Sequence, residues 1–361
     1  MSPTWRPGAT TATSPWSTSR PSKPGRAWPG CRRPTAPPPP ASDHQPPASK
    51  EISMTTVAFI GLGIMGGPMA GHLVKAGFDV VGYNRSQPKI DELVAAGGKG
   101  ANSIADAVRE ADVVAVMVPD SPDVRQVLAG DGGVFSSAKP GTLIIDFSSI
   151  RPDVTTELAA QAKERGFRLL DAPVSGGEAG AKNAALSIMV GGDQADFDAA
   201  ADVFAAVGKT IVRVGPNGAG QTVKAANQLI VAGNIQLLAE AVAFVEAYGV
   251  DTEAAITVLG GGLAGSKVLD QKGANMLGRT FHPGFRIELH HKDLGIVTAA
   301  AREAGVVIPL GAVVAQLMAS AVANGDGGLD HSALLRGVLR LSGQDPDAAP
   351  ATASDSDSSA S

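Results

Sequence analysis

Apolar runs alternate with stretches of helical periodicity from Met54 to about residue 214. The four clearest runs are uniformly apolar and rich in β-branched residues, which is typical of parallel strands covered on both faces. They are TVAFI (56–60), FDVVGY (78–83), DVVAVMV (112–118) and TLIIDF (142–147), and the series continues at 167–171, 185–191 and 210–214. Strands separated by helices form βαβ units, so the pattern predicts an α/β fold with a doubly wound, mostly parallel sheet.

The pattern changes at about residue 218, after which we expect only helices. Residues 218–249 predict one long helix that is apolar on nearly every face, as in a helix buried between neighbours. Its longest uncharged stretch, 225–239, has 15 residues and includes two Asn and two Gln, which is too short and too polar to cross a bilayer. Further helices are predicted at about 251–260, 264–277, 290–304, 309–324 and 330–341.

The first apolar run leads directly into Gly61-Leu62-Gly63-Ile64-Met65-Gly66. This is a G-x-G-x-x-G sequence between a strand and a helix, the context in which such a sequence binds a dinucleotide. The first glycine allows a tight turn, the second allows the backbone to approach a pyrophosphate, and the third allows close helix packing. The free N–H groups and the positive dipole end of the helix suit the phosphates. The segment predicts an NAD(P) site, with a simple glycine turn as the alternative.

The second run ends at Asn84-Arg85-Ser86. Sites that prefer NAD usually carry Asp or Glu here to bind the ribose 2′-hydroxyl, and neither is present. Arg85 can instead pair with a 2′-phosphate, flanked by Asn84 and Ser86. The alternative is an ordinary turn in which Arg85 is solvated. We expect NADP in preference to NAD.

Four regions follow from these patterns. Residues 1–53 are rich in Pro, Ser, Thr and Arg, and predict a disordered extension. An over-long start of the reading frame or a transit peptide are alternatives, although the prolines oppose the amphipathic helix of a transit peptide. Residues 54–217 predict an NAD(P)-binding Rossmann domain. Residues 218–343 predict an all-α C-terminal domain joined to it by the long helix, and residues 344–361 a disordered tail.

Charge and cysteine content narrow the choice of partners. The net charge is −5, and the extension is basic, so the rest of the chain is the more acidic part. This argues against nucleic acid as a partner. The single cysteine, Cys31, lies in the extension, so the remaining chain has no disulfide and no thiolate metal site. We therefore expect a cytoplasmic protein that binds neither nucleic acid nor membrane.

Hydride transfer requires a proton donor, a group that binds the substrate carboxylate, and exclusion of water. The turn at Ser175, Gly176 and Gly177 follows an apolar run, and its hydroxyl and N–H groups can form an anion site. The alternative is a purely structural turn. Lys224 and Asn227 are three residues apart on the long helix, hence on one face. If Lys224 is buried in a cleft, its pKa falls and it becomes a usable acid/base; otherwise it extends to solvent from the helix end.

A second candidate cation is Lys292, in the segment His290-His291-Lys292-Asp293-Leu294. The adjacent histidines suggest a metal site at first sight. However, neighbouring side chains on a helix point apart, and no carboxylate pattern accompanies them. We expect no metal.

Four segments together resemble the β-hydroxyacid dehydrogenases. They are GLGIMGGPMAGHL (61–73), DAPVSGGEAGAKNAALSIMVGGD (171–193), GAGQTVKAANQ (218–228) and HKDL (291–294), and the resemblance covers residues 54–341. Residues 261–270, 282–294 and 329–335 look most like family members that act on 2-hydroxy-3-oxopropanoate. The resemblance thus implies NAD(P)H-dependent reduction of a small aldehyde bearing a carboxylate, here to D-glycerate, or the reverse oxidation of a hydroxy acid.

The resemblance also implies roles at matching positions. Lys224 matches the catalytic lysine, which protonates the nascent alkoxide, and Asn227 matches a substrate-binding asparagine. Ser175, Gly176 and Gly177 match the loop that binds the substrate carboxylate.

Two further matches concern the cofactor and assembly. Ser149 and Lys292 match positions beside the cofactor, and family members commonly form homodimers or homotetramers through the helical domain. The segment 84–86 differs from the Asp-Arg sequence of some reductases of this type, so cofactor preference does not transfer.

Three other functions stay open at this stage. A sister enzyme acting on 3-hydroxyisobutyrate or another semialdehyde would use the same machinery. An imine reductase usually has another residue at the position of Lys224, which weighs against it. A non-catalytic nucleotide-binding scaffold would be expected to have lost the lysine.

Overall fold

Nine strands and the helices between them occupy residues 56–215 of the computed structural model, which describes residues 55–348. The predicted extension 1–53 and residues 349–361 of the predicted tail lie outside the described residues. The strands are β1 (Thr56–Ile60), β2 (Asp79–Tyr83), β3 (Lys99–Gly100), β4 (Val113–Val116), β5 (Leu143–Asp146), β6 (Arg168–Asp171), β7 (Val174–Ser175), β8 (Leu186–Gly191) and β9 (Gly208–Gly215). The helices are α1 (Gly66–Lys75), α2 (Gln87–Ala95), α3 (Ile104–Val108), α4 (Ser121–Ala129), α5 (Val134–Ser137), α6 (Pro152–Glu164), α7 (Gly177–Lys182), α8 (Gln194–Ala199) and α9 (Ala201–Val207).

The strands form one sheet in the order β3-β2-β1-β4-β5-β6-β8-β7, with β9 paired to β8. Pairing is parallel from β3 to β6 and between β8 and β9, and antiparallel where β8 meets β6 and β7. The predicted doubly wound, mostly parallel sheet is thereby confirmed. The apolar pattern missed β3 and β7, because two-residue strands are too short to show a period.

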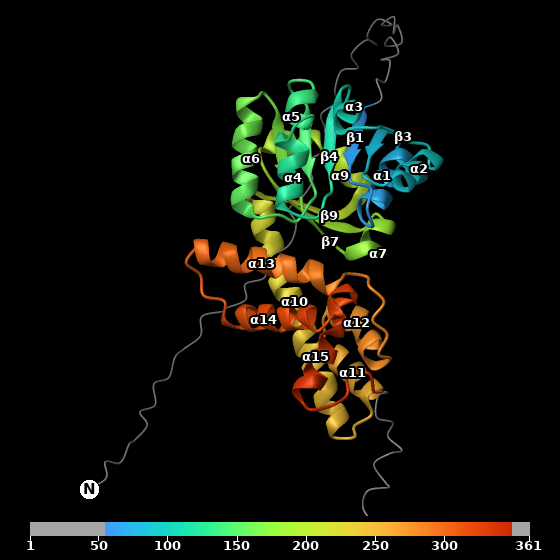
Figure 1. Ribbon diagram of the computed structural model, residues 1–361, viewed down its shortest axis with the longest axis vertical. Helices are drawn as coiled ribbons and strands as arrows, with labels where there is room; N and C mark the ends of the chain where they lie inside the picture. Colours follow the sequence, from blue (N-terminus) through green and yellow to red (C-terminus); the bar gives the residue numbers. More distant parts are fainter. Residues whose placement is uncertain (1–54, 349–361) are drawn as a thin grey trace, which may run out of the picture. The chain divides into compact units, whose positions relative to one another are not determined.

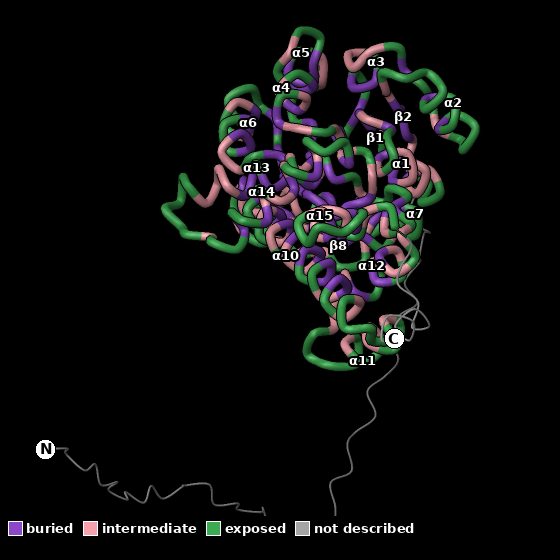
Figure 2. Tube along the Cα trace, turned by 60° about the horizontal axis from the view of Figure 1, so that its bottom comes forward, coloured by how far each residue is buried: buried purple, intermediate pink, exposed green. Residues whose placement is uncertain are grey.

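Burial on both faces explains why the strands are uniformly apolar. In β1, Val57 and Phe59 belong to one core cluster together with Leu73 of α1. Ala58 and Ile60 point to the opposite face and belong to a second cluster that includes residues of α3 to α6. Alternate residues therefore enter two different cores, and Figure 2 shows the strands buried beneath more exposed helices such as α2.

After β9 the described chain is helical. The elements are α10 (Ala219–Ala247), α11 (Thr252–Gly260), α12 (Lys267–Leu277), α13 (Ile287–Glu303), α14 (Pro309–Ala323), the short 3-10 helices η1 (Asp326–Gly328) and η2 (His331–Ala333), and α15 (Leu334–Leu341). They enclose a third core, in which Ile235 and Val242 of α10 pack with Met318 and Leu335. Helix α10 contacts β8 and β9 near its start and α12 to α15 further along (Figure 1). It joins the sheet to the helical region, as predicted.

One expectation for α10 was wrong in part, since the helix is not buried on every side. Ile230, Leu237 and Phe244 are 62%, 60% and 63% exposed and follow one another at seven-residue intervals. By length and composition alone α10 could cross a membrane. Its buried face, however, includes the polar residues Gln221, Lys224, Gln228 and Gln236, and packs against the sheet and the other helices.

The start of α10 is tied to the sheet by a buried carboxylate. Asp171, the last residue of β6, accepts hydrogen bonds from the backbone N–H groups of Gly218 at 2.8 Å and Gln221 at 3.0 Å. A carboxylate is favourable here because it satisfies free N–H groups at the positive end of the helix dipole. Asp171 therefore fixes the first turn of α10, and so the lysine one turn further on, relative to the sheet.

Candidate active site

In the glycine-rich turn between β1 and α1, two glycines are packed against other backbone atoms and one has free space beside its Cα. A Cβ on Gly61, where φ is +99°, would overlap the Met117 carbonyl oxygen, and a Cβ on Gly66 would overlap the Gly61 carbonyl oxygen. A Cβ on Gly63 would meet nothing within 4 Å. Packing requires the first and last glycines, whereas Gly63 leaves an open edge of backbone that a pyrophosphate can approach. The residues present therefore fit a dinucleotide.

The residues between these glycines face in different directions. Leu62 is buried below the turn, Met65 packs against the core on the α1 side of the sheet, and Ile64 is exposed beside Gly63. Of the three side chains, that of Ile64 is the most accessible to a ligand.

At the end of β2, the Asn84 side chain forms hydrogen bonds with the backbone of the glycine-rich turn and of residue 86. Its Oδ1 accepts a hydrogen bond from the Leu62 N–H at 3.1 Å, and its Nδ2 donates to the Ser86 carbonyl at 3.3 Å. Arg85 and Ser86 are exposed at the start of α2. The structure thus brings Asn84 beside the glycine-rich turn and leaves the neighbouring Arg85 exposed.

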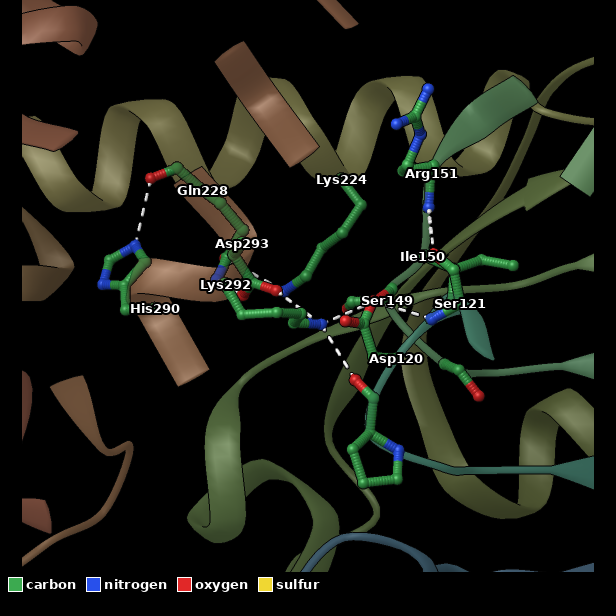
Figure 3. A network of polar contacts seen from close by, with 12 residues as sticks. Asp120, Ser121, Ser149, Ile150, Arg151, Lys224, Gln228, His290, Lys292 and Asp293 are labelled. Carbon is green, nitrogen blue, oxygen red and sulfur yellow. Dashed lines mark hydrogen bonds and ion pairs between the residues drawn. The ribbon is translucent and has the colours of Figure 1, made fainter. Parts of the chain in front are cut away.

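Lys224 is buried, with 9% of its surface exposed. Its Nζ donates to Gln228 Oε1 at 3.0 Å, and its side chain lines a small cavity together with Ser149, Ile150 and Asp293 (Figure 3). Burial lowers the pKa of Lys224 to about 8; Asp293 acts in the opposite direction and Lys292 in the same direction. A lysine of this kind can lose and regain a proton near neutral pH.

The polar chain continues from Lys224 across to helix α13. Gln228 Nε2 donates to Asp293 Oδ2 at 2.5 Å, and Asp293 Oδ1 pairs with Lys292 Nζ at 2.9 Å. Asn227, half-buried, makes no hydrogen bond to Lys224 but donates from Nδ2 to Gln228 Oε1 at 2.8 Å. Two donors from one helix therefore converge on a single amide oxygen.

Lys292 connects α13 to two loops that follow strands of the sheet. Its Nζ donates to the backbone carbonyls of Ser149 at 2.7 Å and Pro119 at 2.9 Å. Ser149 lies after β5 and Pro119 after β4, at the carboxyl edge of the sheet where ligands of doubly wound folds bind. The structure thus places Ser149, Lys292 and Lys224 in one cluster.

Gln221 holds the same loop from α10. Its Oε1 accepts from the Ile150 N–H at 3.1 Å, and its Nε2 donates to the Ser148 carbonyl at 2.8 Å. Below the loop, Asp146 at the end of β5 accepts from the Ser148 N–H at 3.0 Å. Burial raises the pKa of Asp146 to about 7. The loop after β5 is therefore fixed by hydrogen bonds with Gln221 of α10 and with Asp146 of the sheet.

The predicted anion loop lies outside the small cavity at Lys224. Ser175 ends β7, and Gly176 and Gly177 have φ of +134° and +60°, which favour glycine. None of the three lines that cavity. The positive φ angles explain why glycine occupies positions 176 and 177. The role of these residues toward a substrate stays a prediction.

Gln228 and Asp293 were not predicted as site residues from the sequence. Gln228 was within reach of a spacing argument, because it is four residues after Lys224 on the same helix face. Asp293 directly follows the predicted cation Lys292, but its approach to α10 could be found only from the fold. His290, one turn of α13 away, contacts the Gln228 carbonyl through Nε2 at 3.2 Å and the His331 ring through Nδ1 at 3.0 Å. It is part of the packing behind Gln228.

Two family models match consecutive parts of the chain. Residues 56–215 match the NAD binding domain of 6-phosphogluconate dehydrogenase, and residues 218–338 match the NAD-binding domain of NADP-dependent 3-hydroxyisobutyrate dehydrogenase.

The chain also matches relatives over nearly the whole length of each relative. The chain is 43% identical to the 2-hydroxy-3-oxopropionate reductase of Escherichia coli (strain K12) over 78% of this chain and 96% of that protein. It is 39% identical to the probable 3-hydroxyisobutyrate dehydrogenase-like 2 of Arabidopsis thaliana over 83% and 99%. Among solved structures, the 3-hydroxyisobutyrate dehydrogenase of Mycobacterium tuberculosis superposes with a TM-score of 0.72, with 34% identity over 79% of this chain and 99% of that chain.

The doubly wound sheet, the open glycine turn and the buried lysine define an NAD(P)-dependent oxidoreductase, and the relatives are oxidoreductases of small hydroxy acids and semialdehydes. This agrees with the expected class and sets aside the scaffold interpretation. The chain belongs to the β-hydroxyacid dehydrogenase family.

Proposed function

We propose that this dehydrogenase reduces 2-hydroxy-3-oxopropanoate (tartronate semialdehyde) to D-glycerate. The observation that carries the proposal is the buried Lys224, whose pKa of about 8 suits a proton donor and acceptor at neutral pH. The substrate assignment is supported by the 43% identity to the Escherichia coli reductase and by the sequence segments at 261–270, 282–294 and 329–335.

When bound, the nicotinamide cofactor supplies the hydride that the aldehyde carbon accepts. The Lys224 ammonium donates a proton to the carbonyl oxygen, which becomes the new hydroxyl group, and in the reverse direction the neutral amine removes that proton. Ser175 and the N–H groups of Gly176 and Gly177 would bind the carboxylate, and Asn227 would orient the substrate hydroxyl. In the cofactor site Arg85, flanked by Asn84 and Ser86, would favour NADPH over NADH.

Steady-state kinetics on a substrate panel tests this assignment. We expect the highest kcat/KM on tartronate semialdehyde, compared with glyoxylate, succinic semialdehyde and methylmalonate semialdehyde, each with NADPH and NADH. A higher kcat/KM on methylmalonate semialdehyde would instead assign the second candidate, a 3-hydroxyisobutyrate dehydrogenase, which the 34% identity to the Mycobacterium tuberculosis enzyme favours.

We further propose that the protein is a cytoplasmic homodimer or homotetramer without nucleic acid or membrane partners. The apolar stripe on α10 formed by Ile230, Leu237 and Phe244 supports self-association, because a second copy that covers it would remove this area from water. Light scattering tests the assembly. We expect a mass of two or four chains, and a smaller assembly for Leu237→Glu; a monomeric native protein would contradict the proposal.

A further inference from the structure

Gln228 lies between the buried lysine and the nearest carboxylate and contacts both. Its Oε1 accepts from Lys224 Nζ, and its Nε2 donates to Asp293 Oδ2. All three side chains are buried. We propose that Gln228 is a positioning residue: a neutral bridge that prevents a direct Lys224–Asp293 ion pair and so leaves the lysine able to exchange its proton during the reaction. This inference rests on the proposed acid/base role of Lys224.

The chemistry of the two neighbours fixes which way the amide faces. An ionised carboxylate only accepts hydrogen bonds and an ammonium only donates them. Nε2 must therefore face Asp293, and Oε1 must face Lys224. Asn227 reinforces this orientation, because its Nδ2 also donates to Gln228 Oε1. A reversed amide would place donor against donor at Lys224 and acceptor against acceptor at Asp293 in a buried site, which is strongly unfavourable.

The charge of Asp293 is balanced on its other side. Asp293 Oδ1 pairs with Lys292, whose Nζ also donates to the Ser149 and Pro119 carbonyls. Asp293 thus has a cationic partner without Lys224. A direct carboxylate partner would raise the pKa of Lys224 toward or above its ordinary value of 10.5 and hold it as an ammonium. With the amide interposed, burial is the larger effect and lowers that pKa.

Few other titratable groups face Lys224. From α13 these are Asp293, Lys292 and His290, and burial lowers the pKa of His290. The loop after β5 contributes Ser149 and Ile150 to the cavity, neither of which titrates near neutral pH.

The bridge is compatible with both forms of the lysine. An ammonium has three hydrogens and a neutral amine has two, so either form can donate one hydrogen to Gln228 Oε1. The contact can therefore persist while the proton is transferred. The remaining positions on Nζ are then available to the cavity lined by Ser149 and Ile150.

Gln228→Ala tests the bridge, with the pKa of Lys224 measured by NMR of the protein labelled at lysine Cε and the resonance assigned with Lys224→Met. Removing the amide opens space for the direct ion pair, so we expect the pKa to rise by at least about one unit. At pH 8 this lowers the neutral fraction of Lys224 by about fivefold, and hydroxy acid oxidation should slow by a similar factor. Gln228→Asn keeps an amide but is one methylene shorter; it should raise the pKa too and serves if the alanine variant does not fold.

Two matched variants separate a bridge from a structural effect. Gln236 is a buried glutamine on the same helix that bonds to Glu240 instead, so Gln236→Ala should leave the pKa of Lys224 unchanged. In the double variant Gln228→Ala/Asp293→Asn the pKa should not rise. The proposal is overturned by an unchanged or lower pKa in folded Gln228→Ala, or by a rise that persists in the double variant. The NMR titration needs no substrate, so a wrong substrate assignment would leave this result intact.

Discussion

Replacing Lys224 by methionine should make the protein more stable and almost inactive. Methionine has a similar length and no charge, and the lysine it replaces is 9% exposed. Lowering a pKa from 10.5 to about 8 corresponds to about 3 kcal/mol against the buried ammonium. Part of this is offset because the hydrogen bond to Gln228 is lost. We expect the free energy of unfolding to rise by about 1–3 kcal/mol at pH 7, and kcat to fall by at least ~10²-fold.

The stability gain should depend on pH in a defined direction. The pKa of Lys224 is lower in the folded state than in the unfolded chain, so between about pH 8 and 10.5 the unfolded chain binds more protons. The native protein therefore becomes more stable as the pH rises through this window. The advantage of Lys224→Met should be full below pH 8 and shrink toward pH 10.5.

Urea denaturation at pH 7 and pH 10, together with steady-state kinetics, measures both effects. Lys209→Met, at an exposed position on β9, is the matched control and should change neither quantity appreciably. A variant less stable than the native protein at pH 7, or one whose difference from it does not change with pH, would refute the burial argument. Near-normal turnover would remove Lys224 from the chemistry.

Three other outcomes follow from the site. The kcat/KM for aldehyde reduction should fall as the pH rises through about 8, because the Lys224 ammonium is the proposed proton donor; a flat profile from pH 6.5 to 9.5 would contradict this. Arg85→Ala should weaken binding of NADPH by about tenfold or more and that of NADH little; equal losses by calorimetry would exclude a 2′-phosphate contact. Gly66→Ala should lower both Tm and cofactor affinity, since its Cβ overlaps backbone. Gly63→Ala should lower affinity alone, and a comparable drop in Tm for both variants would show that the open edge was misjudged.

The fold could be predicted from sequence wherever burial imposed a strong pattern. Strands covered on both faces, such as β1 and β4, are uniformly apolar, and the glycine-rich turn lies where G-x-G-x-x-G after a strand placed it. The antiparallel pairing of β8 with β6 was not predicted, because apolar content does not encode strand direction. The exposed side of α10 was missed for a related reason: apolar side chains such as Leu237 look alike in sequence whether a neighbour covers them or not.

In the candidate site, too, some features could be predicted from the sequence and others could not. Lys224 was identified as a charged residue in an otherwise apolar helix, and Lys292 as a second cation whose role was then suggested by the family resemblance. The contacts that set the lysine's environment depend on α13 crossing α10 at one position, which brings Asp293 to Gln228 across 65 residues of sequence. A local sequence pattern contains no information on where two helices distant in sequence cross. Asn227 shares a hydrogen-bond acceptor with Lys224, because its amide donates to the same Gln228 oxygen, and its role toward a substrate stays a prediction.

The hydrogen bonds from the first turn of α10 to Asp171 have a consequence for how this architecture can diversify. They fix the lysine relative to the sheet through contacts that do not involve the helices after α10. Those later helices can change length or sequence while the Lys224 ammonium keeps its position relative to the sheet. Insertions between β9 and α10, by contrast, would displace it at once, and this short junction should tolerate the least variation in length.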